Sequence, residues 1–239
     1  MLVHGGLLWR VTKSADYARG PRSCQPPSAY ARGMPALEPI HVDAALLVLD
    51  KPAGLLAVPG RREADCLSAR AQRQWPDALV VHRLDMATSG LMLLARGAEM
   101  QRRLSMAFAA RAVDKRYEAL VHGAIDGDAG EIALPIGADW PDRPRQRVDA
   151  DRGRPALTRW RVIDRSHDGR TTRLELEPVT GRTHQLRVHL QAIGHPIVGD
   201  ALYGPRDDAP ARLHLHARSL ALIHPLDGRR LEASSAAPF

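Results

Sequence analysis

The spacing of apolar residues divides the chain into an irregular beginning and a regular remainder. Residues 1–36 have few periodic apolar positions and contain a Gly-Gly pair and several prolines. Such a stretch predicts a disordered extension or an over-long start, with Met34 as an alternative initiator. Beyond it we find neither an internal repeat nor a linker, which favours one domain over residues 37–239.

Three segments place apolar residues three and four positions apart, which is the spacing of one face of a helix. They are residues 65–75, 98–111 and 183–193. In the last of these, Thr183 is a suitable N-cap and Gly194 follows the final turn. We therefore expect three helices, each with one apolar face.

Short apolar runs and the alternation of apolar with polar residues predict strands in the same part of the chain. These segments are 44–60, in which a Pro-Ala-Gly turn separates two runs, 90–95, 116–122, 172–179 and 213–224. Because the strands and helices do not alternate regularly, we predict a fold of the α+β class.

The composition gives the chain a positive net charge that arises almost entirely from arginine. The chain has 239 residues, of which 44% are hydrophobic, and its formal net charge is +7. Of the 34 Lys and Arg residues only three are lysines, and arginine is the side chain that pairs bidentately with phosphate. An arginine-rich basic chain indicates a polyanion partner, most often nucleic acid. A GC-rich genome would also raise the arginine content, and composition alone leaves both explanations open.

Cysteines and apolar runs limit the class of protein. Cys24 and Cys66 are too few for a disulfide framework or for an all-cysteine zinc site. No apolar run approaches the length of a membrane span, and the first residues are too polar for a secretory signal. We therefore expect a cytoplasmic protein that does not contact a membrane.

The first candidate for chemistry is the loop of residues 82–90, between two apolar runs. It contains Asp85 next to basic and hydroxyl residues, namely His82, Arg83 and Thr88. A loop held by apolar segments is a common way to fix a reactive carboxylate. The residues alone slightly favour a simpler alternative, in which Asp85 caps a turn and Arg83 pairs with it.

The second candidate is the segment 180–189, at the start of the third predicted helix. Arg182 lies at the helix entrance, where its guanidinium can hold a carboxylate in its ionised form. Arg187 and the helix start can bind phosphate. The alternative is a capping or surface role, which is favoured for His184 and His189.

The third candidate is the arginine-rich stretch 139–160, which three prolines stiffen. Its arginines suit a surface that follows a phosphate backbone, and they are Arg143, Arg145, Arg147, Arg152 and Arg154. Charge runs are usually solvated loops, but Trp140 and the net charge favour a nucleic-acid contact here.

Metal and nucleotide chemistry have little support in the sequence. His214 and His216 share one face of a predicted strand, and His189 and His195 are further possible ligands, but no carboxylate accompanies them at motif spacing. We favour structural roles for these histidines. Phosphate-binding loops, dinucleotide fingerprints and serine-nucleophile motifs are absent from the sequence, so we expect no metal and no cofactor.

Five blocks of the sequence, in order, resemble the RluA-type family of pseudouridine synthases. They are LDKPAGLLAVPG (49–60), HRLDMATSGLMLLA (82–95), RYEALVHG (116–123), GRTHQLRVHLQAIGHPIVGDALYG (181–204) and LHLHARSLALIHP (213–225). The resemblance covers residues 40–239. It implies a mixed, mostly antiparallel sheet flanked by helices and loops, with an active-site cleft across the sheet. Residues 1–36 are too short and irregular for the S4 RNA-binding domain of the larger members.

The resemblance also implies a reaction and the residues that perform it. The family converts uridine in RNA to pseudouridine without a cofactor, after flipping the base out of its stack. By the match, Asp85 is the essential carboxylate, Arg182 is its ion partner and Tyr117 is the active-site tyrosine. Leu186 is an apolar floor, and Arg83 fills the place that the flipped base vacates.

The segment DWPDRPRQ (139–146) further resembles family members that act on both 23S rRNA and the tRNA anticodon stem-loop. We therefore expect these two RNAs as partners, and a monomeric enzyme. Two alternatives remain. One is a metal-dependent hydrolase that uses His214 and His216, and the other is a catalytically inactive RNA-binding or ribosome-assembly module on the same fold.

Overall fold

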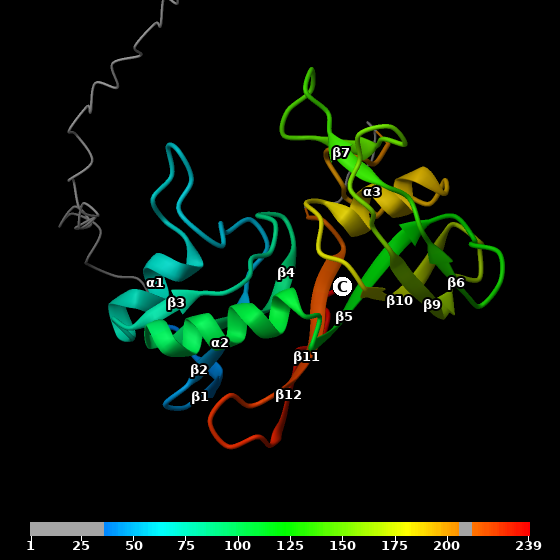
Figure 1. Cartoon of the computed structure of the whole chain (residues 1–239). Coiled ribbons are helices and arrows are strands. Elements are labelled where there is room, and N and C mark those ends of the chain that lie inside the picture. Colours follow the sequence, from blue (N-terminus) through cyan, green and yellow to red (C-terminus); the bar gives the residue numbers. More distant parts are fainter. Residues whose placement is uncertain (1–35, 206–211) are drawn as a thin grey trace, which may run out of the picture. The chain divides into compact units, whose positions relative to one another are not determined.

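The computed structural model describes residues 36–205 and 212–239 (Figure 1). The irregular extension predicted for residues 1–36 falls almost entirely outside these residues. Within the two described ranges, no helix combines the length and the apolar character that crossing a membrane requires.

The described residues form one long mixed sheet with the strand order β1-β2-β4-β11-β5-β10-β9-β6, to which β3 and β12 add at the sides. The strands are β1 (Pro39–Val42), β2 (Leu46–Lys51), β3 (Ala78–Val80), β4 (Ser89–Arg96), β5 (Val113–His122), β6 (Ala129–Ile132), β9 (Thr158–Arg165), β10 (Thr171–Pro178), β11 (Leu215–Ile223) and β12 (Arg230–Ser234). A separate hairpin consists of β7 (Ile136–Ala138) and β8 (Gln146–Val148). The predicted α+β class is confirmed.

Three helices cover different parts of the sheet, as predicted: α1 (Leu67–Gln74), α2 (Gly97–Ala109) and α3 (Gln185–Ala192). Figure 1 shows α2 along the half of the sheet that contains β3 and β4, and α3 in the other half. Met100 and Leu104 of α2 pack against the leucines of β4. Leu186 and Leu190 of α3 pack against β5 and β10. The two halves therefore have separate apolar cores.

The start of α3 differs from the prediction. The helix begins at Gln185, and its N-cap is His184, not Thr183. The reason lies in the Gln185 side chain, whose Oε1 accepts hydrogen bonds from the Arg182 N–H at 3.0 Å and the Thr180 hydroxyl at 2.7 Å. These bonds close a turn over residues 180–185, and they leave the Thr183 side chain exposed.

One parallel pair of strands joins the two halves. β4 pairs with β11 in parallel at Ser89 and Gly90, whereas all other strand pairs of the described sheet are antiparallel. A Cβ atom at Gly90 would lie 2.4 Å from the carbonyl oxygen of Ala217, so only glycine permits this approach. Because β5 is the other neighbour of β11, the loop before β4 comes close to β5 and to the turn before α3.

Candidate active site

A cavity of about 640 Å³ opens where the two halves of the sheet meet. Five segments line it: the loop before β4, the end of α2, the middle of β5, the turn that leads into α3 and the start of β11. Its polar and aromatic lining residues include His82, Arg83, Asp85, Thr88, Phe108, Arg111, Lys115, Tyr117, Arg182, His184 and Arg187. Asp85 is the one carboxylate among the described residues of this lining.

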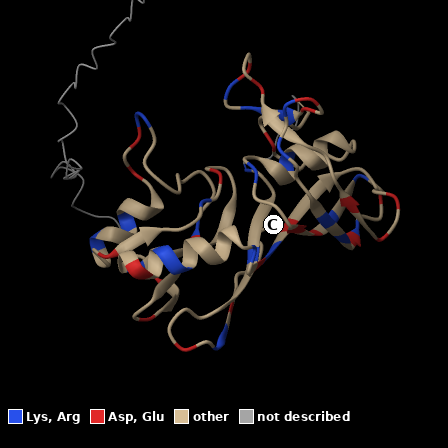
Figure 2. Cartoon of the chain, viewed as in Figure 1, with Lys and Arg blue, Asp and Glu red and all other residues tan. Residues whose placement is uncertain are grey.

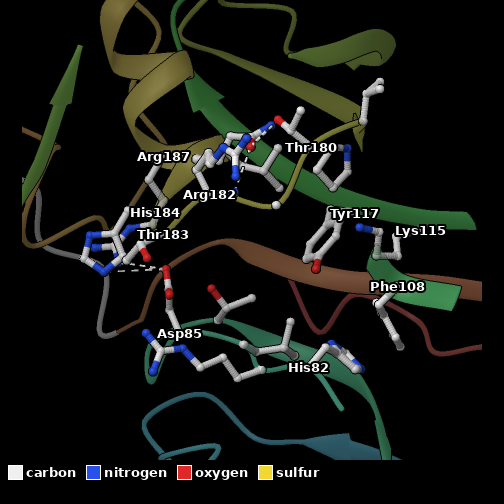
Figure 3. Close-up of a pocket in the computed structure, with 18 of the residues that line it drawn as sticks. His82, Asp85, Phe108, Lys115, Tyr117, Thr180, Arg182, Thr183, His184 and Arg187 are labelled. Carbon is white, nitrogen blue, oxygen red and sulfur yellow. Dashed lines mark hydrogen bonds and ion pairs between the residues drawn. The ribbon is translucent and has the colours of Figure 1, made fainter. Parts of the chain in front are cut away.

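Asp85 lies in a turn whose backbone is hydrogen-bonded on both sides. The Thr88 N–H donates to the Asp85 carbonyl at 3.1 Å, and the Gly54 N–H donates to the Met86 carbonyl at 2.9 Å. The side chain of Asp85 is 24% exposed and points into the cavity (Figure 3). A partly exposed carboxylate on a fixed turn can reach a substrate without a rearrangement of the backbone.

A buried lysine supports this turn from below. Lys51 has no solvent exposure, and its ammonium donates to the carbonyls of Pro52 and Leu55 at 2.8 Å and of Met86 at 3.0 Å. Burial lowers the pKa of Lys51 to about 8, while nearby Asp85 opposes the shift. The lysine thus ties the chain after β2 to the turn that carries Asp85.

The ion partner of Asp85 is Arg187, so the predicted pair with Arg182 is wrong. Arg187 is 4% exposed, and its guanidinium binds Asp200 through two contacts of 2.7 Å and Asp85 through one of 3.3 Å. Arg182 instead donates Nε to the Pro155 carbonyl at 3.0 Å, on another part of the rim. Arg187 lies inside α3 on its buried face, whereas Arg182 precedes the helix and follows the turn outward.

Tyr117 of β5 lies in the same cavity as Asp85, and its ring packs with the cluster that contains Leu186 and Leu215. Burial, and secondarily the charge of Asp85, raises the pKa of the Tyr117 phenol above its usual value. The phenol therefore stays protonated at neutral pH. It can donate a hydrogen bond and stack on a base, but it does not supply a phenolate.

His82 and Thr88 line the cavity mainly as supports of the Asp85 loop. The Nε2 atom of His82 accepts a hydrogen bond from the Leu93 N–H at 2.9 Å, and its ring stacks on Phe108 with centroids 4.5 Å apart. Burial lowers the pKa of His82 to about 3, so the ring is neutral and can accept this bond. Thr88 is 2% exposed. Contacts of these two residues with a substrate stay predictions.

His184, for which the sequence favoured a capping or surface role, lies inside the site. Its Nε2 is 3.8 Å from Asp85 Oδ2, and its Nδ1 is 2.7 Å from the hydroxyl of Tyr203. That hydroxyl also accepts from the Gln146 N–H at 2.8 Å, so its own proton is free for Nδ1. This arrangement favours the tautomer that carries its proton on Nε2, facing Asp85. Sequence reasoning missed Tyr203, although it ends a block of the family resemblance.

The arginines of the third candidate segment lie outside the cavity lining, and Arg143, Arg145 and Arg147 belong to the β7–β8 hairpin. Arg143 stacks on Trp140 at 3.7 Å, Arg145 lies 3.3 Å from Asp142, and Arg147 lies 3.7 Å from Asp149. Figure 2 shows basic and acidic segments next to each other in this hairpin. Local carboxylates therefore offset part of its positive charge.

The histidines considered as metal ligands have other partners. The His216 ring nitrogens lie 2.9 Å from the Ser89 hydroxyl and 3.1 Å from the Ser235 hydroxyl. His189 contacts the Thr158 hydroxyl and a backbone carbonyl, both at 2.9 Å. In the part of the chain that the structure describes, no three His, Cys, Asp or Glu residues are placed to hold a metal ion together.

Comparisons with known proteins agree with this geometry. Residues 45–192 match the RNA pseudouridylate synthase family. The chain is 46% identical to the dual-specificity RNA pseudouridine synthase RluA of Vibrio cholerae, over 80% of this chain and 79% of that protein. It is 45% identical to the protein of the same name from Yersinia pestis, over 84% and 98%.

Two solved human structures share the fold. Human RNA pseudouridylate synthase domain containing 1 superposes with a TM-score of 0.73 at 30% identity, and the match covers 85% of this chain and 84% of that one. Human RNA pseudouridylate synthase domain containing 4 has a TM-score of 0.67 at 28% identity, over 84% and 88%.

Proposed function

Because the chain belongs to the RNA pseudouridylate synthase family and is an RNA pseudouridine synthase, we propose that its substrates are uridines of 23S rRNA and of the tRNA anticodon stem-loop. Two observations support two substrates. The Vibrio cholerae and Yersinia pestis relatives are named dual-specificity enzymes, and the segment 139–146 resembles the corresponding segment of such members. We further propose that the enzyme works in the cytoplasm, where these RNAs are, and as a monomer.

The observation that carries the proposed mechanism is the position of Asp85 as the one carboxylate in the described lining of the cavity, in contact with Arg187. In the reaction the bond between N1 and C1′ breaks, the uracil turns, and C5 bonds to C1′. The proton that leaves C5 is balanced by the proton that N1 gains. Asp85 either attacks C1′ or removes a proton from the sugar, and both roles need the ionised carboxylate that an arginine stabilises.

Tyr117 and Leu186 supply the surface for the uracil ring in this proposal. A protonated phenol above an apolar floor can stack on the flipped base and donate a hydrogen bond to it. Leu186 is 6% exposed and belongs to the core of the α3 half, so the floor is rigid. A rigid floor limits the turn of the uracil to the plane that presents C5 to C1′.

Arg83 is suited to fill the place of the flipped base. It is exposed, lies two residues from Asp85, and makes no ion pair within the described parts of the chain. The alternative from the sequence, a pair with Asp85, is replaced by the Arg187 contact. A guanidinium without a partner can insert into a helix of RNA and stack on the neighbouring bases, which repays part of the cost of flipping.

The β7–β8 hairpin supplies a second contact with RNA in this proposal. Trp140 is 70% exposed, with Arg143 stacked on it, and such a pair can stack on an unpaired base. Arg145 and Arg147 add positive charge, which their local carboxylates reduce. We therefore expect that replacing Arg143, Arg145 and Arg147 with glutamine lowers RNA affinity by less than the loss of three phosphate contacts from unpaired arginines would.

The test is the release of tritium from RNA that carries [5-³H]uridine. An anticodon stem-loop and a 23S rRNA fragment serve as substrates, with wild-type protein and Asp85→Asn compared. Release from both RNAs, lost in the variant while RNA binding persists, supports the proposal. Release from one RNA removes the dual specificity, and substantial activity in Asp85→Asn removes the role of Asp85. Binding without release by the wild type would favour the inactive RNA-binding module.

A further inference from the structure

The arginines of this protein fall into two groups by their partners. Many surface arginines pair with a carboxylate within 3.3 Å, among them Arg70, Arg96, Arg102, Arg103, Arg165 and Arg230. By contrast, Arg111, Arg154 and Arg182 form no ion pair with any described residue. Arg111 and Arg182 line the active-site cavity, and Arg154 adjoins Pro155, whose carbonyl holds the Arg182 side chain.

Arg111 and Arg154 both lie close enough to Arg182 for their charges to act on its guanidinium. Burial, and after it the charges of Arg154 and Arg111, lowers the pKa of the Arg182 guanidinium. Burial, and after it the charge of Arg111, likewise lowers the pKa of Lys115, another lining residue. A protein gains no stability from unpaired like charges at this distance, so a ligand with negative charge is the natural partner.

The backbone at Arg111 is strained in a way that places its side chain at the cavity. Arg111 follows α2 with a φ of 60°, a left-handed conformation in which glycine is usual at the end of a helix. The only other described non-glycine residue with a positive φ is His184, which also lines the cavity. Residues in strained backbone conformations of this kind cluster at functional sites, where the surrounding structure stabilises them.

The Arg182 side chain is oriented by a bond that leaves its outer end free. Its Nε donates to the Pro155 carbonyl at 3.0 Å, so its terminal Nη atoms remain available for a ligand. Figure 3 shows Arg182 on the wall formed by the turn before α3 and Asp85 on the loop opposite. A ligand that bridges the rim and Asp85 must therefore combine an anionic part with a part that enters the cavity.

We propose that Arg111, Arg154 and Arg182 form a phosphodiester-binding site that holds the RNA backbone beside the flipped uridine. The inference rests on the proposed function, and it assigns the strongest backbone contact to this rim and not to the β7–β8 hairpin, whose Arg145 and Arg147 already have carboxylate partners. The guanidinium fork matches the two free oxygens of a phosphodiester. Anchoring the backbone there fixes the sugar of the extruded nucleotide over Asp85.

Salt dependence of RNA binding is the first part of the test. The dissociation constant of a labelled anticodon stem-loop is measured between about 50 and 200 mM salt, for wild type, Arg182→Gln and Arg111→Gly. Arg111→Gly is chosen because glycine relieves the positive φ, so the variant keeps its fold. Arg170→Gln is the matched control, since Arg170 is exposed and lies next to Asp168 in a distant turn.

We expect each rim variant to reduce the slope of log affinity against log salt by about one, and the control to leave it unchanged. The second part uses RNA with a neutral methylphosphonate at one phosphate next to the target uridine. This RNA should bind wild type more weakly, and Arg182→Gln should lose little further affinity with it. Two results would overturn the proposal. One is an unchanged salt slope in both rim variants, and the other is that the affinity losses from Arg182→Gln and from the methylphosphonate add in full.

Tritium release by the wild type in the same samples separates the two hypotheses. Release together with unchanged slopes overturns the phosphate site and leaves the synthase intact. Reduced slopes without release from any RNA support the phosphate site and overturn the proposed substrates.

Discussion

The hydroxyl of Tyr203 lies 2.7 Å from Nδ1 of His184, and this bond is the middle link between the β7–β8 hairpin and the loop that carries Asp85. On one side the same hydroxyl accepts from the Gln146 N–H at the start of β8. On the other side His184 faces Asp85 at 3.8 Å. A displacement of the hairpin at Gln146 would therefore reach His184, the side chain that faces Asp85.

Tyr203→Phe should reduce kcat more than it changes KM for RNA. The substitution leaves His184 Nδ1 and the Gln146 N–H without their partner, at a cost of about 1–3 kcal/mol for each buried polar group. The measurement is a double-mutant cycle with His184→Gln, read as the rate of tritium release. If the two side chains act through this bond, the double variant should lose little more rate than either single variant. Additive losses of rate would refute the connection.

Arg187→Ala should abolish turnover and also destabilise the protein. Its removal leaves Asp200, which is 2% exposed, as a buried charge without its ion pair, and such losses cost about 3–5 kcal/mol. Urea denaturation measures the effect. Arg182→Ala is the control, because Arg182 is only partly buried and forms no ion pair with a described residue, so its loss should cost about 1 kcal/mol. Equal stability of the two variants would contradict the geometry around Asp85.

Stability should fall as the pH decreases from about 6.5 towards about 3, with His82 as one cause. The folded state holds this ring neutral, with a pKa of about 3, whereas the unfolded chain takes up a proton near pH 6.5. The unfolded state thus binds more protons in this window, and acid favours it.

The free energy of unfolding against pH, for wild type and His82→Gln, measures this contribution. Glutamine can still accept the bond from the Leu93 N–H but does not titrate. The wild-type curve should be steeper below pH 6.5, by at most about 1.4 kcal/mol per pH unit. Parallel curves would show that the ring does not remain neutral in the folded protein.

Lys51→Met should loosen the Asp85 loop. Methionine fills a similar volume but leaves the carbonyls of Pro52, Leu55 and Met86 without their shared donor. We expect a lower midpoint of unfolding, together with faster hydrogen exchange at the Gly54 and Thr88 amides, which close this turn. Exchange at wild-type rates would mean that the backbone bonds alone hold the loop.

The elements predicted correctly are either continuous apolar runs, as in β2 and β4, or segments with strong periodicity and one buried face. The α2 segment shows this with Met100 and Leu104, and β10 shows it with Leu174 and Leu176. The strand β9 was missed although Thr158, Trp160 and Val162 alternate at a spacing of two, because arginines between them resemble a charged loop. The three-residue strands β7 and β8 are too short for any periodicity, so the hairpin was read only as a stiff basic segment.

The active site was predicted in part. Asp85 and Tyr117 follow from contiguous blocks of sequence, and the structure places both in one cavity. Tyr203 also lies in such a block, but nothing in the block indicates a role for it. Its position depends on the hairpin and on the turn before α3, which the sequence does not relate to each other.

Composition and local spacing are enough to indicate which side chains are available for chemistry, the basic character of the chain and the α+β class. Tertiary structure alone decided that Arg187 pairs with Asp85 and that Arg182 does not. Arg187 lies on the buried face of α3, whereas Arg182 precedes the helix and donates to the Pro155 carbonyl, so two arginines of one short block face different directions. The parallel pairing of β4 with β11 then brought Asp85 to the buried one, across about a hundred residues of chain.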